Sequence, residues 1–322
     1  MFRSSLRTLC TAVAISASCG AAQSPAAPTT QPLVWDATNA TLYSRVVASA
    51  TQREAEWTAF RRDLHRHPEL SRQELRTSSL IADRLRALGL EVRTGIGGYG
   101  VVGVLKGVRS GPVIAYRADM DAFASQDADP VDFPSETPGV RHICGHDLHI
   151  TIGLALATAL ASVKSELGGT IMFIFQPAEE SATGAKAMLD AGVFSTLKPS
   201  AIFGIHTAPG DTGQISSHAG RMMNANAVAP GVINDEPLLT KARSSITTAL
   251  GADAFSDSGD PPGQFSEDFG HFQAQVPGVF FFLGATNRAA GLVSYPHTSA
   301  FALDERAILV GVRAMAAVVL GV

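Results

Sequence analysis

Apolar residues in the first third of the chain recur at the three- and four-residue spacing of an α-helix. The spacing runs through residues 45–64 and again through residues 72–88, with arginine and glutamate between the apolar positions. Between the two stretches, His67-Pro68-Glu69 contains a proline, which disfavours helical backbone at the residue before it. The pattern therefore predicts two amphipathic helices separated by a break.

Short runs rich in β-branched and aromatic residues follow, as is typical of buried strands. We expect strands over residues 100–105, 112–116, 169–175, 200–205 and 279–283. Helix-like stretches lie between several of these runs, and the last segment of the chain again has helical spacing, which predicts an amphipathic closing helix over 304–320. This alternation predicts an α/β fold with a mostly parallel sheet flanked by helices.

The N-terminal 22 residues have the order of a secretory signal. Two arginines precede a short apolar stretch at 9–17, and the small residues Cys19-Gly20-Ala21-Ala22 follow. The stretch is shorter than the roughly 20 apolar residues that a membrane-spanning helix needs. We therefore expect export to the periplasm or the medium without stable membrane insertion. A lipid anchor on Cys19 is the alternative, although Ser16 stands where such signals usually have leucine.

Composition narrows the class of protein further. Residues 23–35 are rich in Ala, Pro, Ser and Thr, so we expect a linker there and a single catalytic domain over residues 36–322. The chain is 46% hydrophobic and 17% charged, which excludes disorder for its bulk. Its net charge of −4, with no basic run, argues against nucleic acid as a partner. Three cysteines do not make a disulfide framework.

One segment concentrates residues that bind metal ions. His142-Ile143-Cys144-Gly145-His146-Asp147-Leu148-His149 holds three histidines, a cysteine and an aspartate. Thiolate and imidazole suit divalent ions such as zinc, and Gly145 permits a tight turn between Cys144 and His146. The alternative interpretation is a capped helix start, in which Asp147 serves the first turn.

Other polar residues follow the predicted strands, at the edge where ligands gather in open α/β sheets. Asp119 and Asp121 follow one strand, and His206 follows another. Glu179 and Glu180 would repel each other unless a cation or a proton neutralises one of them, which suits a metal ligand beside a general base. An acidic first turn of a following helix is the equal alternative for this pair.

At this point the chain resembles the aminoacylase and hippurate hydrolase type of metallopeptidase, which includes N-acyl-amino-acid amidohydrolases of the IAA-amino acid hydrolase-like branch. The resemblance spans residues 55–320. The motifs that carry it are Arg62-Asp63-Leu64-His65-Arg66-His67-Pro68-Glu69-Leu70-Ser71, Arg117-Ala118-Asp119-Met120-Asp121, His142-Ile143-Cys144-Gly145-His146-Asp147, Gln176-Pro177-Ala178-Glu179-Glu180 and Ser266-Glu267-Asp268-Phe269.

The resemblance implies a zinc-peptidase-like catalytic domain and a role for each candidate residue. Glu179 would be the general base, and Asp119 or Asp147 would orient a ligand imidazole from behind. One or two divalent ions (Mn, Zn or Co) would be held by Cys144, His146, Glu180, His206 and His297.

The chain departs from this family where its members usually carry a lid domain that also dimerises. Here the sequence passes from 221–225 almost directly into the return sequence at 229–235, so we expect that the lid is missing and that the protein is a monomer. In the family the lid is thought to supply an oxyanion-stabilising histidine. Losing one such donor typically costs about 100- to 1,000-fold in turnover.

These patterns predict a secreted metal-dependent amidohydrolase that cleaves the amide bond of N-acyl amino acids or small peptides. The alternative is a catalytically impaired metal-binding remnant of the same family. The retained Glu179 argues against the remnant, because a protein that only binds metal has no use for a base at this position.

Overall fold

Helices and strands alternate along the chain, as the hydrophobic pattern predicts. The structure, a computed structural model, describes Met1 and residues 37–257 and 266–321. The predicted signal and linker therefore lie outside the described residues, apart from Met1. The α-helices are α1 (Ala37–Thr51), α2 (Glu54–Arg66), α3 (Leu75–Ala87), α4 (His146–Ala161), α5 (Gly184–Asp190), α6 (Glu236–Leu250), α7 (Gly270–Gln273) and α8 (Ala307–Gly321). Short 3-10 helices are η1 (Lys164–Glu166), η2 (Ala252–Ala254) and η3 (Arg288–Ala290).

Eight strands form one mixed sheet in the order β1-β2-β6-β3-β7-β12-β8-β11. Its central pairs, β3 with β6, β3 with β7 and β7 with β12, are parallel, and β1 and β2 extend it antiparallel. The strands of this sheet are β1 (Glu91–Ile96), β2 (Gly100–Lys106), β3 (Arg109–Asp119), β6 (Gly168–Gln176), β7 (Ala201–Asp211), β8 (Ile215–Ser216), β11 (Phe255–Ser256) and β12 (Gly278–Thr286). Two small sheets pair β4 (Phe123–Ala124) with β5 (Val140–Arg141) and β9 (Gly220–Arg221) with β10 (Ile233–Asn234).

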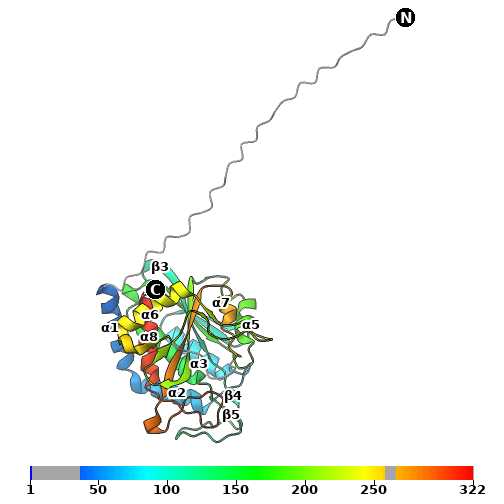
Figure 1. Cartoon of the computed structure of the whole chain (residues 1–322), viewed down its shortest axis with the longest axis vertical. Coiled ribbons are helices and arrows are strands. Elements are labelled where there is room, and N and C mark those ends of the chain that lie inside the picture. The colour runs from blue at the N-terminus through cyan, green and yellow to red at the C-terminus, as the bar shows by residue number, and fades with distance from the viewer. Residues whose placement is uncertain (2–36, 258–265, 322) are drawn as a thin grey trace. The chain divides into compact units, whose positions relative to one another are not determined.

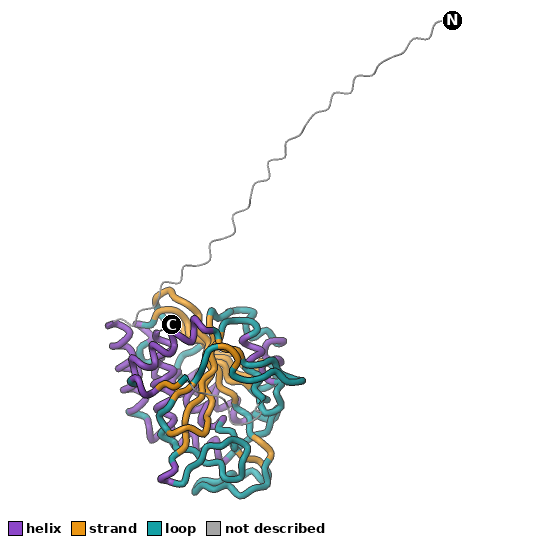
Figure 2. Tube along the Cα trace, viewed as in Figure 1, coloured by secondary structure: helices purple, strands orange, loops and turns teal. Residues whose placement is uncertain are grey.

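Helices cover both faces of the sheet, which confirms the predicted α/β architecture. Figure 1 shows α1, α6 and α8 grouped on one side of the sheet and α5 and α7 on the other, and Figure 2 shows the strands running between these helical layers. Along β6, Ile171, Phe173 and Phe175 belong to one buried apolar cluster, while Met172 and Ile174 belong to the other. The two-residue period of a strand thus supplies a separate core to each face.

Some element boundaries differ from the prediction. The helical stretch predicted over 45–64 is two helices, because α1 ends at Thr51 and α2 begins at Glu54. The apolar spacing continues across this joint, so periodicity alone does not reveal it. Strand β1 was not predicted, since its positions are mostly polar and at least partly exposed at the edge of the sheet.

The described helices include none that is both long and apolar enough to cross a membrane. The predicted loss of the lid domain stays a prediction, but the structure shows how the chain closes at that point. Gly220 pairs with Asn234 and Arg221 pairs with Ile233, so β9 and β10 meet in an antiparallel ladder. The Met222 amide also donates a hydrogen bond of 2.9 Å to the Val232 carbonyl.

Candidate metal centre

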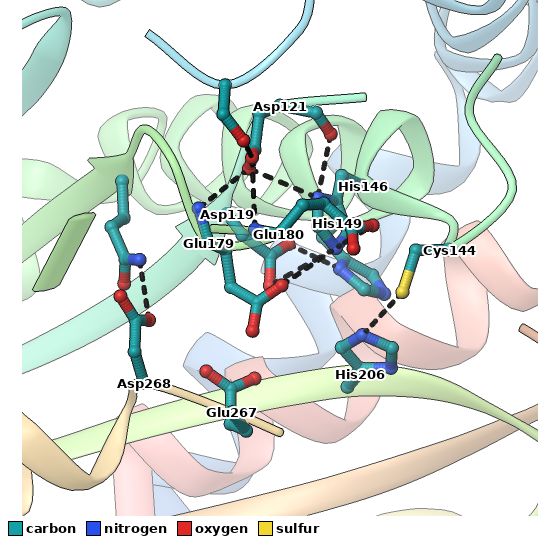
Figure 3. A network of polar contacts seen from close by, with 12 residues as sticks. Asp119, Asp121, Cys144, His146, His149, Glu179, Glu180, His206, Glu267 and Asp268 are labelled. Atoms are coloured by element: carbon teal, nitrogen blue, oxygen red, sulfur yellow. Dashed lines mark hydrogen bonds and ion pairs between the residues drawn. The ribbon is translucent and has the colours of Figure 1, made fainter. Parts of the chain in front are cut away.

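The candidate site lies where the central parallel strands end. Asp119 is the last residue of β3, Gln176 is the last of β6, and His206 lies in β7 between them and β12. The first turn of α4 brings His146 to the same edge, and Figure 3 shows Asp119, His146 and His206 converging with Glu179 and Glu180 on one buried space. This is the place where ligands gather in open α/β sheets.

Gly145 shapes the loop that presents two of the candidate ligands. Its φ is 91°, in the left-handed region that favours glycine, and a Cβ atom there would lie 2.6 Å from the Thr207 hydroxyl oxygen. A larger residue would therefore be strained and would also collide with β7. The turn places Cys144 on one side of the loop and starts α4 at His146 on the other, as the sequence predicts.

His146 has one ring nitrogen fixed and the other directed at carboxylates. Nδ1 lies 2.8 Å from the Asp121 carbonyl oxygen, which makes Nδ1 a donor and leaves Nε2 as the ring nitrogen that can bind an ion. Nε2 is buried without a hydrogen-bond partner and lies 3.8 Å from Asp119 Oδ2, 3.8 Å from Glu179 Oε2 and 3.9 Å from Glu180 Oε1. These gaps are too long for hydrogen bonds and suit ligand bonds of about 2.0–2.2 Å to an ion between the groups.

The remaining candidate ligands form the other half of the centre. His206 Nδ1 lies 2.8 Å from the Thr207 carbonyl oxygen, so its Nε2 carries the lone pair and lies 3.4 Å from Cys144 Sγ. His297 Nε2 lies 3.0 Å from Glu180 Oε2. One ligand atom each of Cys144, Glu180 and His297 lies within 4.8 Å of the other two. The structure thus brings all five predicted ligands together.

The charges of the site favour a bound cation. Burial opposes a proton on His146, but Asp119, Asp121 and Glu180 outweigh burial and raise its pKa to about 10. Burial, together with Glu180 and Glu179, raises the pKa of the Cys144 thiol well above its usual value. Buried carboxylates are costly unless a positive charge pairs with them. A divalent ion would supply that charge and would also stabilise the thiolate.

Glu179 and Glu180 lie in a turn, not in the first turn of a helix. Helix α5 begins only at Gly184, so the alternative interpretation of the acidic pair as a helix start is wrong. Their backbone amides donate to the two carboxylate oxygens of Asp121 at 3.0 Å each, which fixes the turn. Burial and the neighbouring Glu267 and Glu180 raise the pKa of Glu179 well above its usual value.

The two aspartates proposed as orienting groups lie in different places. Asp119 faces His146 at the centre, and its Oδ1 lies 2.6 Å from His149 Nδ1. Asp147 instead forms ion pairs with Arg61 at 2.9 Å and with His65 at 2.8 Å, so it contacts none of the five candidate ligands. As the alternative interpretation held, Asp147 lies in the first turn of α4, where its Oδ1 accepts the Leu148 amide at 2.8 Å, although the N-cap residue itself is Gly145.

Asp121 and His149 have roles that the sequence analysis did not assign. Asp121 accepts from the amides of the Glu179–Glu180 turn, and its own carbonyl fixes His146. His149 is close enough to the centre to resemble a ligand, but its Nε2 accepts the Thr207 amide at 2.9 Å and its Nδ1 is bound to Asp119. In the sequence, the only indication of a role for Asp121 was its position beside Asp119, just after the apolar run at 112–116.

A cavity of about 240 Å³ opens beside these residues. Its lining includes Glu179 and four of the five candidate ligands, together with apolar residues: Cys144, Glu180, His206 and His297, and Ala208, Pro209, Met223 and Phe282. Ser266 and Glu267, from the last motif of the resemblance, add to its polar lining. The space therefore suits a small molecule with one polar reacting group and one apolar group.

Comparison with known proteins agrees with this site. Residues 115–321 match the model of peptidase family M20/M25/M40. YxeP of Bacillus subtilis, described as a dinuclear metal-binding peptidase of the M20 family, is 28% identical with a TM-score of 0.74, over 84% of this chain and 98% of that one. The predicted resemblance is thereby confirmed at the level of family and fold.

Curated relatives match over shorter segments. N-acetylcysteine deacetylase of Bacillus subtilis is 44% identical over 155 residues, which are 46% of this chain and 39% of the relative. IAA-amino acid hydrolase ILR1-like 4 of Arabidopsis thaliana is 42% identical over 164 residues, which are 51% of this chain and 37% of the relative. The matched segments thus span less than half of these relatives. Since the family model covers more than half of the chain, the chain belongs to peptidase family M20/M25/M40.

Proposed function

We propose that this chain is a metal-dependent amidohydrolase that cleaves the amide bond of N-acyl amino acids or small peptides. The observation that carries the proposal is the environment of His146 Nε2, which is buried, has no hydrogen-bond partner and faces three carboxylates at 3.8–3.9 Å. The substrate class is supported by the names of two curated relatives, N-acetylcysteine deacetylase and IAA-amino acid hydrolase ILR1-like 4.

The residues divide the work of hydrolysis between them. Cys144, His146, Glu180, His206 and His297 would hold one or two divalent ions, and an ion so held polarises a carbonyl and acidifies water. Glu179, which is buried at the cavity wall, accepts a proton from the attacking water and returns it to the nitrogen of the broken amide. One water is consumed, and a carboxylic acid and an amine are released. The apolar residues of the cavity contact the acyl group or an amino-acid side chain.

The proposal is tested by amine release from a panel of N-acyl amino acids and dipeptides, with Mn²⁺, Zn²⁺ or Co²⁺ supplied in turn. Glu179→Ala is compared with the wild type, and metal binding of both is measured by calorimetry. We expect turnover in the wild type and a loss of at least about 100-fold in the variant, with metal affinity largely kept. Glu180→Ala is the matched control, because it removes a ligand from the neighbouring position and should weaken metal binding itself.

An impaired remnant would give a different result. It would bind metal as tightly in the wild type as in Glu179→Ala, and neither protein would release amine from any substrate. Such an outcome would contradict the proposed activity while leaving family membership intact.

We also propose that the protein is exported, on the order of basic, apolar and small residues in its first 22 positions. Expression of the full chain in a Gram-negative host, followed by fractionation and N-terminal sequencing, tests this. We expect a periplasmic form that begins after residue 22. A full-length form that stays in the cytoplasm would contradict export. A form lipidated on Cys19 would show that the exported protein is anchored by a lipid.

A further inference from the structure

We propose that Glu267 binds the amine that leaves when the substrate amide is broken. This inference rests on the proposed amidohydrolase activity and adds a second carboxylate, opposite Glu179, to the groups that contact the reacting atoms. Glu267 belongs to the Ser266-Glu267-Asp268-Phe269 motif, to which the sequence analysis assigned no chemistry.

Glu267 is buried but faces the cavity. Its side chain is 2% exposed, yet it is one of the residues that line the cavity beside Glu179, Glu180 and His206. Figure 3 shows its carboxylate directed toward that of Glu179, on the side away from His146. A substrate in the cavity is therefore within reach of both carboxylates.

The spacing of the two carboxylates suits a nitrogen between them. Glu179, Glu267 and Asp268 each have one carboxylate oxygen within 4.8 Å of those of the other two, and of the three only Glu179 and Glu267 line the cavity. A tetrahedral nitrogen that donates hydrogen bonds of about 2.9 Å to two oxygens holds them about 4.7 Å apart. Glu179 gives its proton to the amide nitrogen as the C–N bond breaks, so the newly formed ammonium sits beside Glu179 and within reach of Glu267.

Arg117 holds Glu267 in this position. Its Nη2 lies 2.8 Å from Glu267 Oε1 and its Nη1 lies 3.2 Å from Oε2, and the Phe269 amide also donates to Oε1 at 2.8 Å. Oε1 is thus fully used, whereas Oε2 has only the longer contact to Arg117. Oε2 is the oxygen with capacity left for a donor from the substrate.

The neighbouring Asp268 contacts the same arginine, but both of its carboxylate oxygens already accept other hydrogen bonds. It lies 3.2 Å from Arg117 Nη2 and accepts from the Gln176 side-chain amide at 2.7 Å and from the Ala185 backbone amide at 2.9 Å. It is not among the residues that line the cavity. Asp268→Asn therefore removes a carboxylate that contacts Arg117 without removing one that lines the cavity.

The experiment compares an N-acyl amino acid with the ester of the same acyl group and the matching hydroxy acid, because the ester releases an alcohol and forms no ammonium. For Glu267→Gln we expect kcat/KM to fall about 10- to 100-fold on the amide and less than about 3-fold on the ester. Asp268→Asn should change both substrates by the same factor. Equal losses on amide and ester in Glu267→Gln would show that Glu267 acts only through Arg117 and would overturn the proposal, as would no loss on either.

A binding measurement separates this proposal from the proposed activity. Calorimetry with the amine product and, separately, with the carboxylic acid product is carried out on the metal-loaded wild type and on Glu267→Gln. We expect the amine to bind at least about 10-fold more weakly to the variant and the acid to bind equally. If the wild type hydrolyses no substrate but still binds the amine more tightly than Glu267→Gln does, the proposed activity is wrong and the proposed amine site is retained. Unchanged amine binding would refute the amine site whatever the turnover.

Discussion

Two buried clusters of histidine and carboxylate each include a residue from the first turn of α4, and they differ in how their polar atoms are paired. In the metal centre, His146 Nε2 has no partner and faces carboxylates at 3.8–3.9 Å. In the second cluster, both ring nitrogens of His65 contact carboxylates, Asp147 at 2.8 Å and Asp129 at 3.0 Å. The candidate metal centre thus leaves a ring nitrogen without a hydrogen-bond partner, whereas both ring nitrogens of His65 have carboxylate partners.

The difference separates a binding site from a structural joint built from the same residue types. The His65 cluster connects helix α2, the loop that carries Asp129 and the start of α4, so its contacts hold three segments together. Its buried charges are matched by opposite charges at hydrogen-bonding distance. In the candidate metal centre the carboxylates outnumber the fixed cations, and a bound ion would complete the balance. Residue identity alone does not tell the two apart, but the distances do.

Arg61→Leu should have the largest effect on stability and should break the structural cluster. Arg61 forms a buried ion pair of 2.9 Å with Asp147, and removing one partner of such a pair leaves an uncompensated charge. We expect the free energy of unfolding to fall by about 3–5 kcal/mol. Urea unfolding of the metal-free protein measures this. A loss below about 1 kcal/mol would mean that the cluster is not a structural joint.

Cys144→Ser should have a smaller effect that depends on metal. At a metal concentration of 100 times the dissociation constant, the wild type gains about 2.7 kcal/mol of stability. A variant that binds 100-fold more weakly gains only about 0.4 kcal/mol under the same conditions. Thermal unfolding with and without chelator measures the difference, and Arg61→Leu should keep the full metal effect. An equal metal-dependent gain in wild type and Cys144→Ser would remove Cys144 from the ligand set.

Asp129→Asn should have the smallest effect, and this effect should depend on pH. Burial disfavours the Asp129 carboxylate, but His65 and Arg141 outweigh burial and hold its pKa at about 2, below the ordinary 3.8. The carboxylate therefore stabilises the fold above pH 4, and this contribution is lost as the pH falls toward 2. Urea unfolding at several pH values should show wild type and variant converging on acidification. A difference that stays constant between pH 6 and pH 3 would contradict this assignment.

Much of the fold follows from local patterns. All five predicted strands are present, because each is a run of apolar residues buried on both faces of the sheet. Strand β1 escaped prediction because an edge strand is partly exposed and carries polar residues, and its antiparallel pairing with β2 depends on a turn that periodicity does not encode. The joint between α1 and α2 escaped for a similar reason, since it leaves the apolar spacing intact.

For the site, the candidate ligand residues could be predicted from the sequence, but the orientation of their side chains could not. Cys144, His146 and Glu180 stand out because the residue types are rare in such spacing. The role of Asp121 could not be predicted from the sequence. Its carboxylate accepts hydrogen bonds from the amides of Glu179 and Glu180, which lie 58 and 59 positions further along the chain. The role of His149 could not be predicted either, because its ring nitrogens contact Asp119 and the Thr207 amide, and spacing in the motif does not reveal these partners.

His297 joins the centre from the far end of the chain, where its φ of 56° and the bond from its amide to the Ile143 carbonyl at 2.8 Å seat it against the Cys144 loop. The other four candidate ligands lie between positions 144 and 206, so on the ribosome they emerge well before it. The complete set of candidate ligands therefore needs the segment after β12 in place, and a chain that stops before residue 297 offers at most four of the five. The metal affinity of the protein thus reports whether the last part of this domain is packed against the Cys144 loop.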